Sequence, residues 1–129
     1  MANYRYLNVL FRLYLLTIII LMMIRTDGKI KLAKTILGVR GDHFVHATLF
    51  IPYMLFIGVI YYQKNNVYLI KNKLYYAIGF GAFCESIHLF LPYRTFSVFD
   101  FFANCFGIGL GLFLWILIKK LLVYFLPLK

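Results

Sequence analysis

Acidic residues are scarce in this chain, whose 129 residues include four Asp or Glu against fourteen Lys or Arg. Only 14% of the residues are charged and 64% are apolar, which gives a mean hydropathy of +0.84. Disorder is excluded, because disordered chains need low hydrophobicity. A nucleic-acid-binding module is disfavoured and no nucleic-acid partner is expected, since the basic residues fall mainly between apolar runs and do not form one cluster.

Cysteine is equally scarce. Cys84 and Cys105 are single thiols in separate apolar runs, so we expect two small buried side chains and no disulfide or redox pair. The sequence also lacks a Gly-rich phosphate loop, a nucleophile elbow, an internal repeat and a low-complexity linker. We therefore predict no cofactor.

Long apolar runs are what the chain has in abundance. A soluble domain of this size could not enclose 14 Phe and 11 Tyr together with the aliphatic residues. At about 1.5 Å per residue, four runs are long enough to cross a hydrocarbon layer of about 30 Å. These runs span residues 7–24, 44–62, 74–91 and 101–118. We predict an all-α membrane protein, a single domain over residues 1–129 formed by a bundle of four transmembrane helices with short loops.

Two features at the ends of the chain have alternatives. The first run could be a signal peptide, with Arg5 and Arg12 as its basic region, but no small-residue cleavage pattern follows it. The tail at 121–126 either extends the last helix or lies along the membrane interface. Eight Lys or Arg fall on the side of the termini and six on the other side, so both termini are expected in the cytoplasm.

Polar residues gather at one depth of the predicted bundle. An ionisable group inside a membrane is costly, so it marks a functional site or a buried pair. Helical spacing places these residues in one leaflet, near the connection that carries Arg94. The cluster consists of Asp42, His46, Glu85, His88, Arg94, Asp100 and Asn104.

Structural roles are the alternative for each member. A carboxylate paired with Arg94 could simply neutralise buried charge and hold helices together. Asn104 could be an interhelical hydrogen-bonding residue, and Gly107 and Gly111 are expected to let a neighbouring backbone approach closely.

Two short motifs have the spacing of metal ligands on a helix. His43 and His46, and likewise Glu85 and His88, are one helical turn apart, as in the Glu-x-x-His motifs of bundle metal sites. With Asp42 or Asp100 they could form a mixed nitrogen and oxygen site. Because such short motifs often arise by chance, the sequence alone predicts no metal.

The order and spacing of the polar residues resemble the signature of VanZ-like membrane proteins. The resemblance covers roughly residues 42 to 111, and size and span number also fit. It rests on Asp42, His46, Glu85, Phe90, Pro92, Arg94, Phe96, Asp100, Asn104, Gly107 and Gly111. This chain departs from the family at His43, where Lys is usual, and at His88, where Gln is usual.

The resemblance implies a multi-pass protein of the bacterial plasma (inner) membrane, in a family associated with resistance to glycopeptide antibiotics, notably teicoplanin. Our leading hypothesis is that the cluster binds an anionic lipid or a lipid-linked envelope precursor. Arg94 would hold phosphate or carboxylate, with His88 and Asn104 as further ligand-binding residues.

Catalytic roles are also considered. Asp42, His46, Glu85 and Asp100 are the candidates for proton handling, with Asp42 fixing the tautomer of His46. The alternatives are an enzyme acting on a lipid-linked phosphate and a structural protein that supports partners. Transport by four spans without a repeat would require an oligomer.

Overall fold

Four long helices form the chain in the computed structural model, which describes residues 4–24, 35–36, 39–62 and 67–125. They are α1 (Tyr4–Met23), α2 (Gly41–Tyr62), α3 (Val67–Ile87) and α4 (Val98–Phe125). A single 3-10 turn, η1 (His88–Phe90), follows α3. Before α2, β1 (Thr35–Ile36) and β2 (Val39–Arg40) form a two-stranded antiparallel pair, with Thr35 opposite Arg40.

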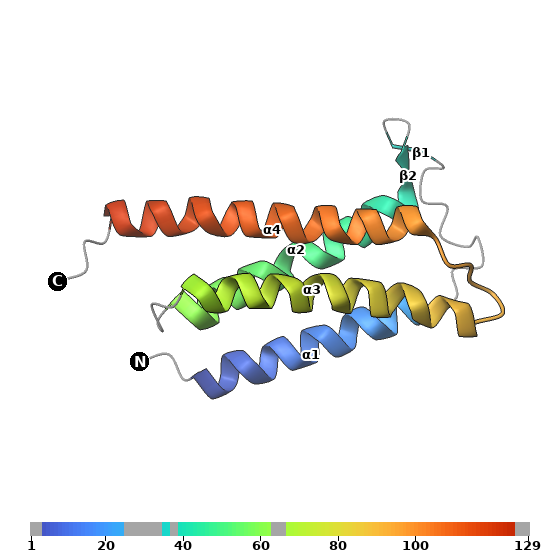
Figure 1. The fold of residues 1–129 in the computed structure, drawn as a ribbon, viewed down its shortest axis with the longest axis horizontal. Coiled ribbons are helices and arrows are strands. Elements are labelled where there is room, and N and C mark those ends of the chain that lie inside the picture. Colours follow the sequence, from blue (N-terminus) through green and yellow to red (C-terminus); the bar gives the residue numbers. More distant parts are fainter. Residues whose placement is uncertain (1–3, 25–34, 37–38, 63–66, 126–129) are drawn as a thin grey trace.

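The helices lie alongside one another with alternating direction (Figure 1). α1 begins and α4 ends at one end of the bundle, whereas α2 and α4 both begin at the other end, where α3 finishes. The most extensive helix contact is between α2 and α4. This arrangement brings the start of α2, the end of α3 and the start of α4 together, as the depth of the polar residues predicted.

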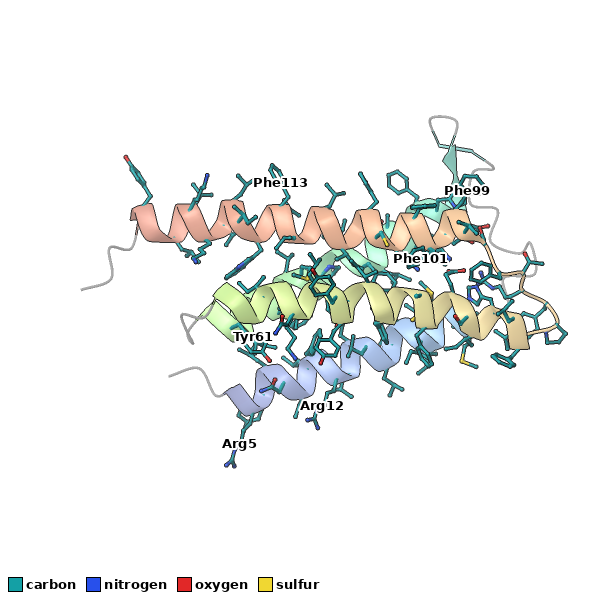
Figure 2. All side chains as sticks on the ribbon, viewed as in Figure 1. Arg5, Arg12, Tyr61, Phe99, Phe101 and Phe113 are labelled. Carbon is teal, nitrogen blue, oxygen red and sulfur yellow. The ribbon has the colours of Figure 1, made fainter. Side chains whose placement is uncertain are left out.

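The core is apolar along most of its length. Its buried side chains come from all four helices and include Ile18, Phe50, Met54, Cys84 and Ile108. Outward-facing positions are also largely apolar, and Phe113 is 56% exposed. Figure 2 shows Phe113 of α4 and Arg12 of α1 pointing away from the other helices.

Three of the helices, α1, α2 and α4, are long and apolar enough to cross a membrane, as expected of a membrane-embedded protein. α3 is not among them, because Lys71, Lys73 and Glu85 all lie within its 21 residues. The predicted all-helical architecture is therefore confirmed for the described helices, apart from the small β1–β2 pair.

The helix ends differ from the predicted runs. α3 begins at Val67 rather than at residue 74, and α4 continues to Phe125 rather than ending at 118. Residues 121–125 of the tail therefore extend the last helix, and residue 126 lies outside the described residues. In both places lysines flank the apolar run, and because lysine is a good helix former, a charged flank ends the apolar segment without ending the helix.

Local signals fix the connection between α3 and α4. Leu91 has extended backbone angles (φ −102°, ψ 118°), as expected for a residue that precedes proline, here Pro92. Ser97 then caps the start of α4, since its hydroxyl accepts a hydrogen bond of 3.3 Å from the backbone N–H of Asp100. The carboxylate of Asp100 is thereby placed in the first turn of α4, where the helix dipole favours negative charge.

Candidate functional site

A polar cluster fills the end of the bundle where α2 and α4 begin. It contains all three histidines of the chain, His43, His46 and His88, together with the carboxylates of Glu85 and Asp100 and the side-chain amide of Asn104. Four of its side chains are buried: His46, Glu85, His88 and Asn104. The structure thus brings together most of the residues that helical spacing had placed at one depth.

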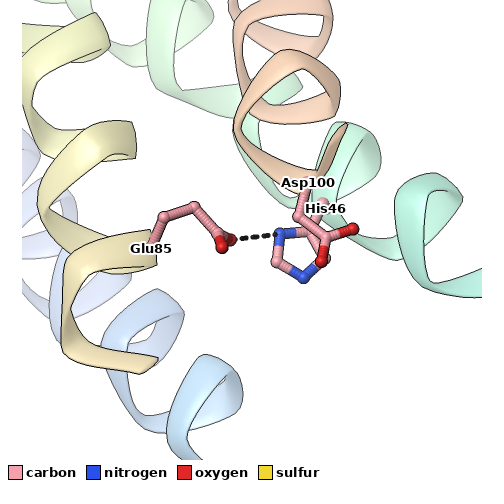
Figure 3. A group of neighbouring side chains, drawn as sticks. All are labelled: His46, Glu85 and Asp100. Atoms are coloured by element: carbon pink, nitrogen blue, oxygen red, sulfur yellow. Dashed lines mark ion pairs between the residues drawn. The ribbon is translucent and has the colours of Figure 1, made fainter. Parts of the chain in front are cut away.

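Glu85 is at the centre of this cluster. Its side chain is fully buried, and its carboxylate oxygens lie 3.2 Å from Nδ1 of His46 and 3.3 Å from Nδ1 of His88. Figure 3 shows the contact with His46 and places Asp100 beside the same imidazole. Neither Glu85 oxygen has a hydrogen-bond partner with suitable geometry among the described residues. Two imidazoles therefore flank one buried carboxylate without completing its hydrogen bonding.

The contacts of His46 indicate where its proton lies. Nδ1 is also 3.2 Å from the side-chain oxygen of Asn104. A carboxylate and an amide oxygen are both acceptors, so this nitrogen must carry a proton to satisfy either of them. Asn104 thus orients His46 through Nδ1, the role that the sequence hypothesis gave to Asp42.

His43 is a site residue that the sequence-based candidates omitted. Its Nδ1 lies 2.5 Å from a carboxylate oxygen of Asp100, and both side chains are partly buried. His43 had been noted only for its one-turn spacing from His46 and for replacing the Lys of similar proteins. Its position in the first turn of α2, opposite the first turn of α4, was the signal that could have identified it.

A second group of contacts holds the end of α1. His88 donates from Nε2 to the carbonyl of Met22 at 3.2 Å, and the hydroxyl of Tyr93 donates to the carbonyl of Met23 at 2.9 Å. Arg94 donates to the carbonyl of Ile24 at 3.0 Å. Three successive carbonyls at a helix C-terminus, which lack partners within their helix, are thus satisfied from one connection.

This capping changes the interpretation of Arg94. The sequence hypothesis assigned its guanidinium to an anionic ligand, whereas the structure gives it a structural contact at α1. A guanidinium has five N–H donors, so this bond leaves others available. Arg94 also lines a small pocket together with Asp42 and His46, which is where the structure places Asp42.

The expected close helix approach is present between α2 and α4. A Cβ added to Gly107 would lie 2.1 Å from the carbonyl oxygen of Ala47, and one added to Gly111 would lie 2.2 Å from that of Ile51. Only glycine permits such backbone contact. The two glycines thereby fix the α2–α4 separation one and two turns below Asn104.

An apolar groove of about 530 Å³ also follows the α2–α4 contact on its outer side. Its walls are aliphatic and aromatic, apart from Thr48 and His43. The lining residues are His43, Phe44, Ala47, Thr48, Ile51, Phe102, Ala103, Phe106 and Leu110. Because His43 contacts Asp100, the groove meets the polar cluster at one end.

Comparisons of this chain with protein-family models, with curated proteins and with solved structures find no match. The fold and the cluster define it as a helical, membrane-embedded protein with a buried group of histidines and carboxylates at one end.

Proposed function

We propose that this protein binds an anionic membrane lipid, with an acyl chain in the α2–α4 groove and the head group beside the polar cluster. The observation that carries the proposal is the position of His43, which lines the apolar groove and contacts Asp100 of the cluster. Lipids combine an apolar chain with a charged head group. This surface offers an apolar groove that meets a polar cluster at one end. A lipid-linked envelope precursor has the same combination.

The membrane setting supports this occupant. The groove lies between two helices that are apolar enough to span a bilayer, so its surroundings are acyl chains. Phe102 and Phe106, which line the groove, are more than 60% exposed. Arg94 lines a small pocket with Asp42 and His46, and its guanidinium has donors beyond the one that bonds to Ile24, which favours anionic over neutral head groups.

We further propose that α3 completes a four-span bundle. Lys73 lies near the start of the helix and can extend to the interface. Glu85, near the other end, is enclosed by His46 and His88 and so does not face lipid. The bundle would belong to a VanZ-like protein of the bacterial plasma membrane with cytoplasmic termini. In that setting, binding an envelope lipid could contribute to teicoplanin resistance.

Native mass spectrometry of the detergent-purified protein tests lipid binding. Ala103→Phe places a large ring in the groove, whereas Ile116→Phe adds a similar ring on the same helix at an exposed position outside it. We expect the original protein and Ile116→Phe to carry phosphatidylglycerol or another anionic lipid, and folded Ala103→Phe to lose it. Equal lipid occupancy in all three proteins, or no bound lipid in any, would contradict the proposal.

A further inference from the structure

Three side chains from three helices converge inside the polar cluster. One potential metal-ligand atom from each of His46, Glu85 and Asp100 lies within 4.8 Å of the others. Figure 3 shows the imidazole of His46 between the two carboxylates. The residues come from positions 46, 85 and 100, so their meeting depends on the helix arrangement and not on a local sequence motif.

The buried carboxylate of Glu85 is an independent indication that this cluster binds a cation. It has no exposed surface, and neither of its oxygens has a hydrogen-bond partner among the described residues. A buried carboxylate needs a counter-charge and hydrogen bonds. The nearby imidazoles provide proximity without the geometry of a hydrogen bond, whereas a bound cation would satisfy both oxygens directly.

Neighbouring residues form contacts that orient these three groups, as the residues behind a metal site orient its ligands. Metal-binding side chains are usually held by a hydrogen bond from their far side. His43 holds Asp100 in this way. The Asn104 contact of His46 is at Nδ1, the nitrogen that also faces Glu85, so a metal bound at Nδ1 would displace the proton that Asn104 accepts. His88 is fixed by its bond to the carbonyl of Met22 and directs an unpartnered Nδ1 toward Glu85.

The geometry points to a binding site for a divalent first-row transition metal ion, held by His46, Glu85 and Asp100. One imidazole nitrogen and two carboxylate oxygens form a donor set suited to Zn²⁺, Mn²⁺ or Co²⁺ and unsuited to Cu⁺, which prefers sulfur. Ligands about 2.0–2.2 Å from a tetrahedral ion lie roughly 3.4 Å apart. Ligand atoms as far apart as 4.8 Å would therefore close by about 1.4 Å, whereas Nδ1 of His46 and the Glu85 carboxylate are already 3.2 Å apart. Three protein ligands leave a fourth position for water or another small ligand.

Metal binding can be tested separately from lipid binding, because the three ligands are not among the residues that line the groove. It also departs from the expectation based on sequence alone, which predicted no metal. The short His and Glu motifs left the choice between Asp42 and Asp100 open, and the helix arrangement brings Asp100 to His46 and Glu85. Failure of either proposal would leave the other standing.

Cobalt titration of untagged, chelator-treated protein in detergent provides the test. Co²⁺ bound by nitrogen and oxygen ligands absorbs visible light, and native mass spectrometry counts the ions on each chain. We expect one Co²⁺ per chain, displaced by one Zn²⁺. Glu85→Gln and Asp100→Asn should each weaken binding at least tenfold. Ser86→Ala, which removes a hydroxyl that donates to the carbonyl of Ala82 within α3 next to Glu85, should change it less than twofold.

Thermal unfolding of the original protein keeps the test decisive if a variant does not fold. A metal that binds only the folded state raises the melting temperature with increasing free ion, so Zn²⁺ should raise it and excess chelator should reverse the shift. Absence of stoichiometric Co²⁺ together with no Zn²⁺-dependent shift would overturn the proposal and leave a proton-sharing network. Equal loss of binding in Ser86→Ala would overturn the assignment of the three ligands.

Discussion

Gly107 of α4 lies directly against the backbone carbonyl of Ala47 in α2, at a point where a Cβ would come within 2.1 Å of the oxygen. Gly111 meets Ile51 in the same way one turn further along. The carbonyls belong to helix backbone, so they cannot move aside as a flexible side chain could. The separation of α2 and α4, and with it the distance of His46 and Asn104 across the cluster, depends on these two contacts.

Gly107→Ala should therefore destabilise the protein by about 1–3 kcal/mol, the usual cost of overpacking. Gly109→Ala is the matched control, since a Cβ there meets nothing within 4 Å and alanine is the better helix former by up to about 1 kcal/mol. Thermal unfolding in one detergent should show a lower melting temperature for Gly107→Ala and an equal or higher one for Gly109→Ala. The same change in both variants would rule out the backbone contact as the cause.

His88 contributes through hydrogen bonding, and this gives a second prediction. His88→Gln keeps a polar side chain that can donate to the carbonyl of Met22, whereas His88→Leu leaves that carbonyl and the buried Glu85 without the imidazole. An unsatisfied buried polar group costs about 1–3 kcal/mol. We expect His88→Leu to lower stability by that amount relative to His88→Gln, as measured by thermal unfolding. Equal stabilities would show that the contact of His88 with α1 contributes little.

Sequence reasoning identified the helices and the shared depth of the polar residues for a simple physical reason. Long apolar runs and the position of each polar residue within its run are both readable without knowing how the helices pack. Glu85, His46 and Asn104 were placed together on this basis, and they do meet. Gly107 and Gly111 were similarly recognised from their four-residue spacing.

The partners within the cluster could not be obtained in this way. The position of a residue within its apolar run shows its depth along the bundle. The rotation of each helix about its own axis decides which residues at one depth are in contact. The assignment of Arg94 to a ligand therefore did not include its contact with α1, and His43 was omitted although it contacts Asp100. The helix ends were missed for a related reason, since hydropathy marks the apolar run and α3 continues beyond it to Val67.

The capping of α1 by the α3–α4 connection leads to a third prediction. Tyr93→Phe removes only the hydroxyl that donates to Met23, and Arg94→Gln removes the guanidinium that donates to Ile24. Both bonds are exposed, so each variant should lose about 0.5–1.5 kcal/mol. Hydrogen exchange should become faster in the last turn of α1, near Met22, while the start of α4 stays unchanged. Equally faster exchange throughout the bundle would contradict a local capping role.

The contact between His43 and Asp100 is best tested with a double-mutant cycle. The two groups lie 2.5 Å apart and are 19% and 15% exposed, so they should couple by about 0.5–3 kcal/mol. His43→Gln and Asp100→Asn should therefore cost less together than the sum of their separate effects on unfolding. Thr17→Val serves as the control for either variant, because Thr17 bonds to Leu13 within α1 and shares no partner with them. A coupling energy near zero in the His43–Asp100 cycle, as in the Thr17 control cycles, would mean that these two neighbours do not stabilise each other. Gly107 and the buried His46–Asn104 contact would then hold α2 and α4 together at this end.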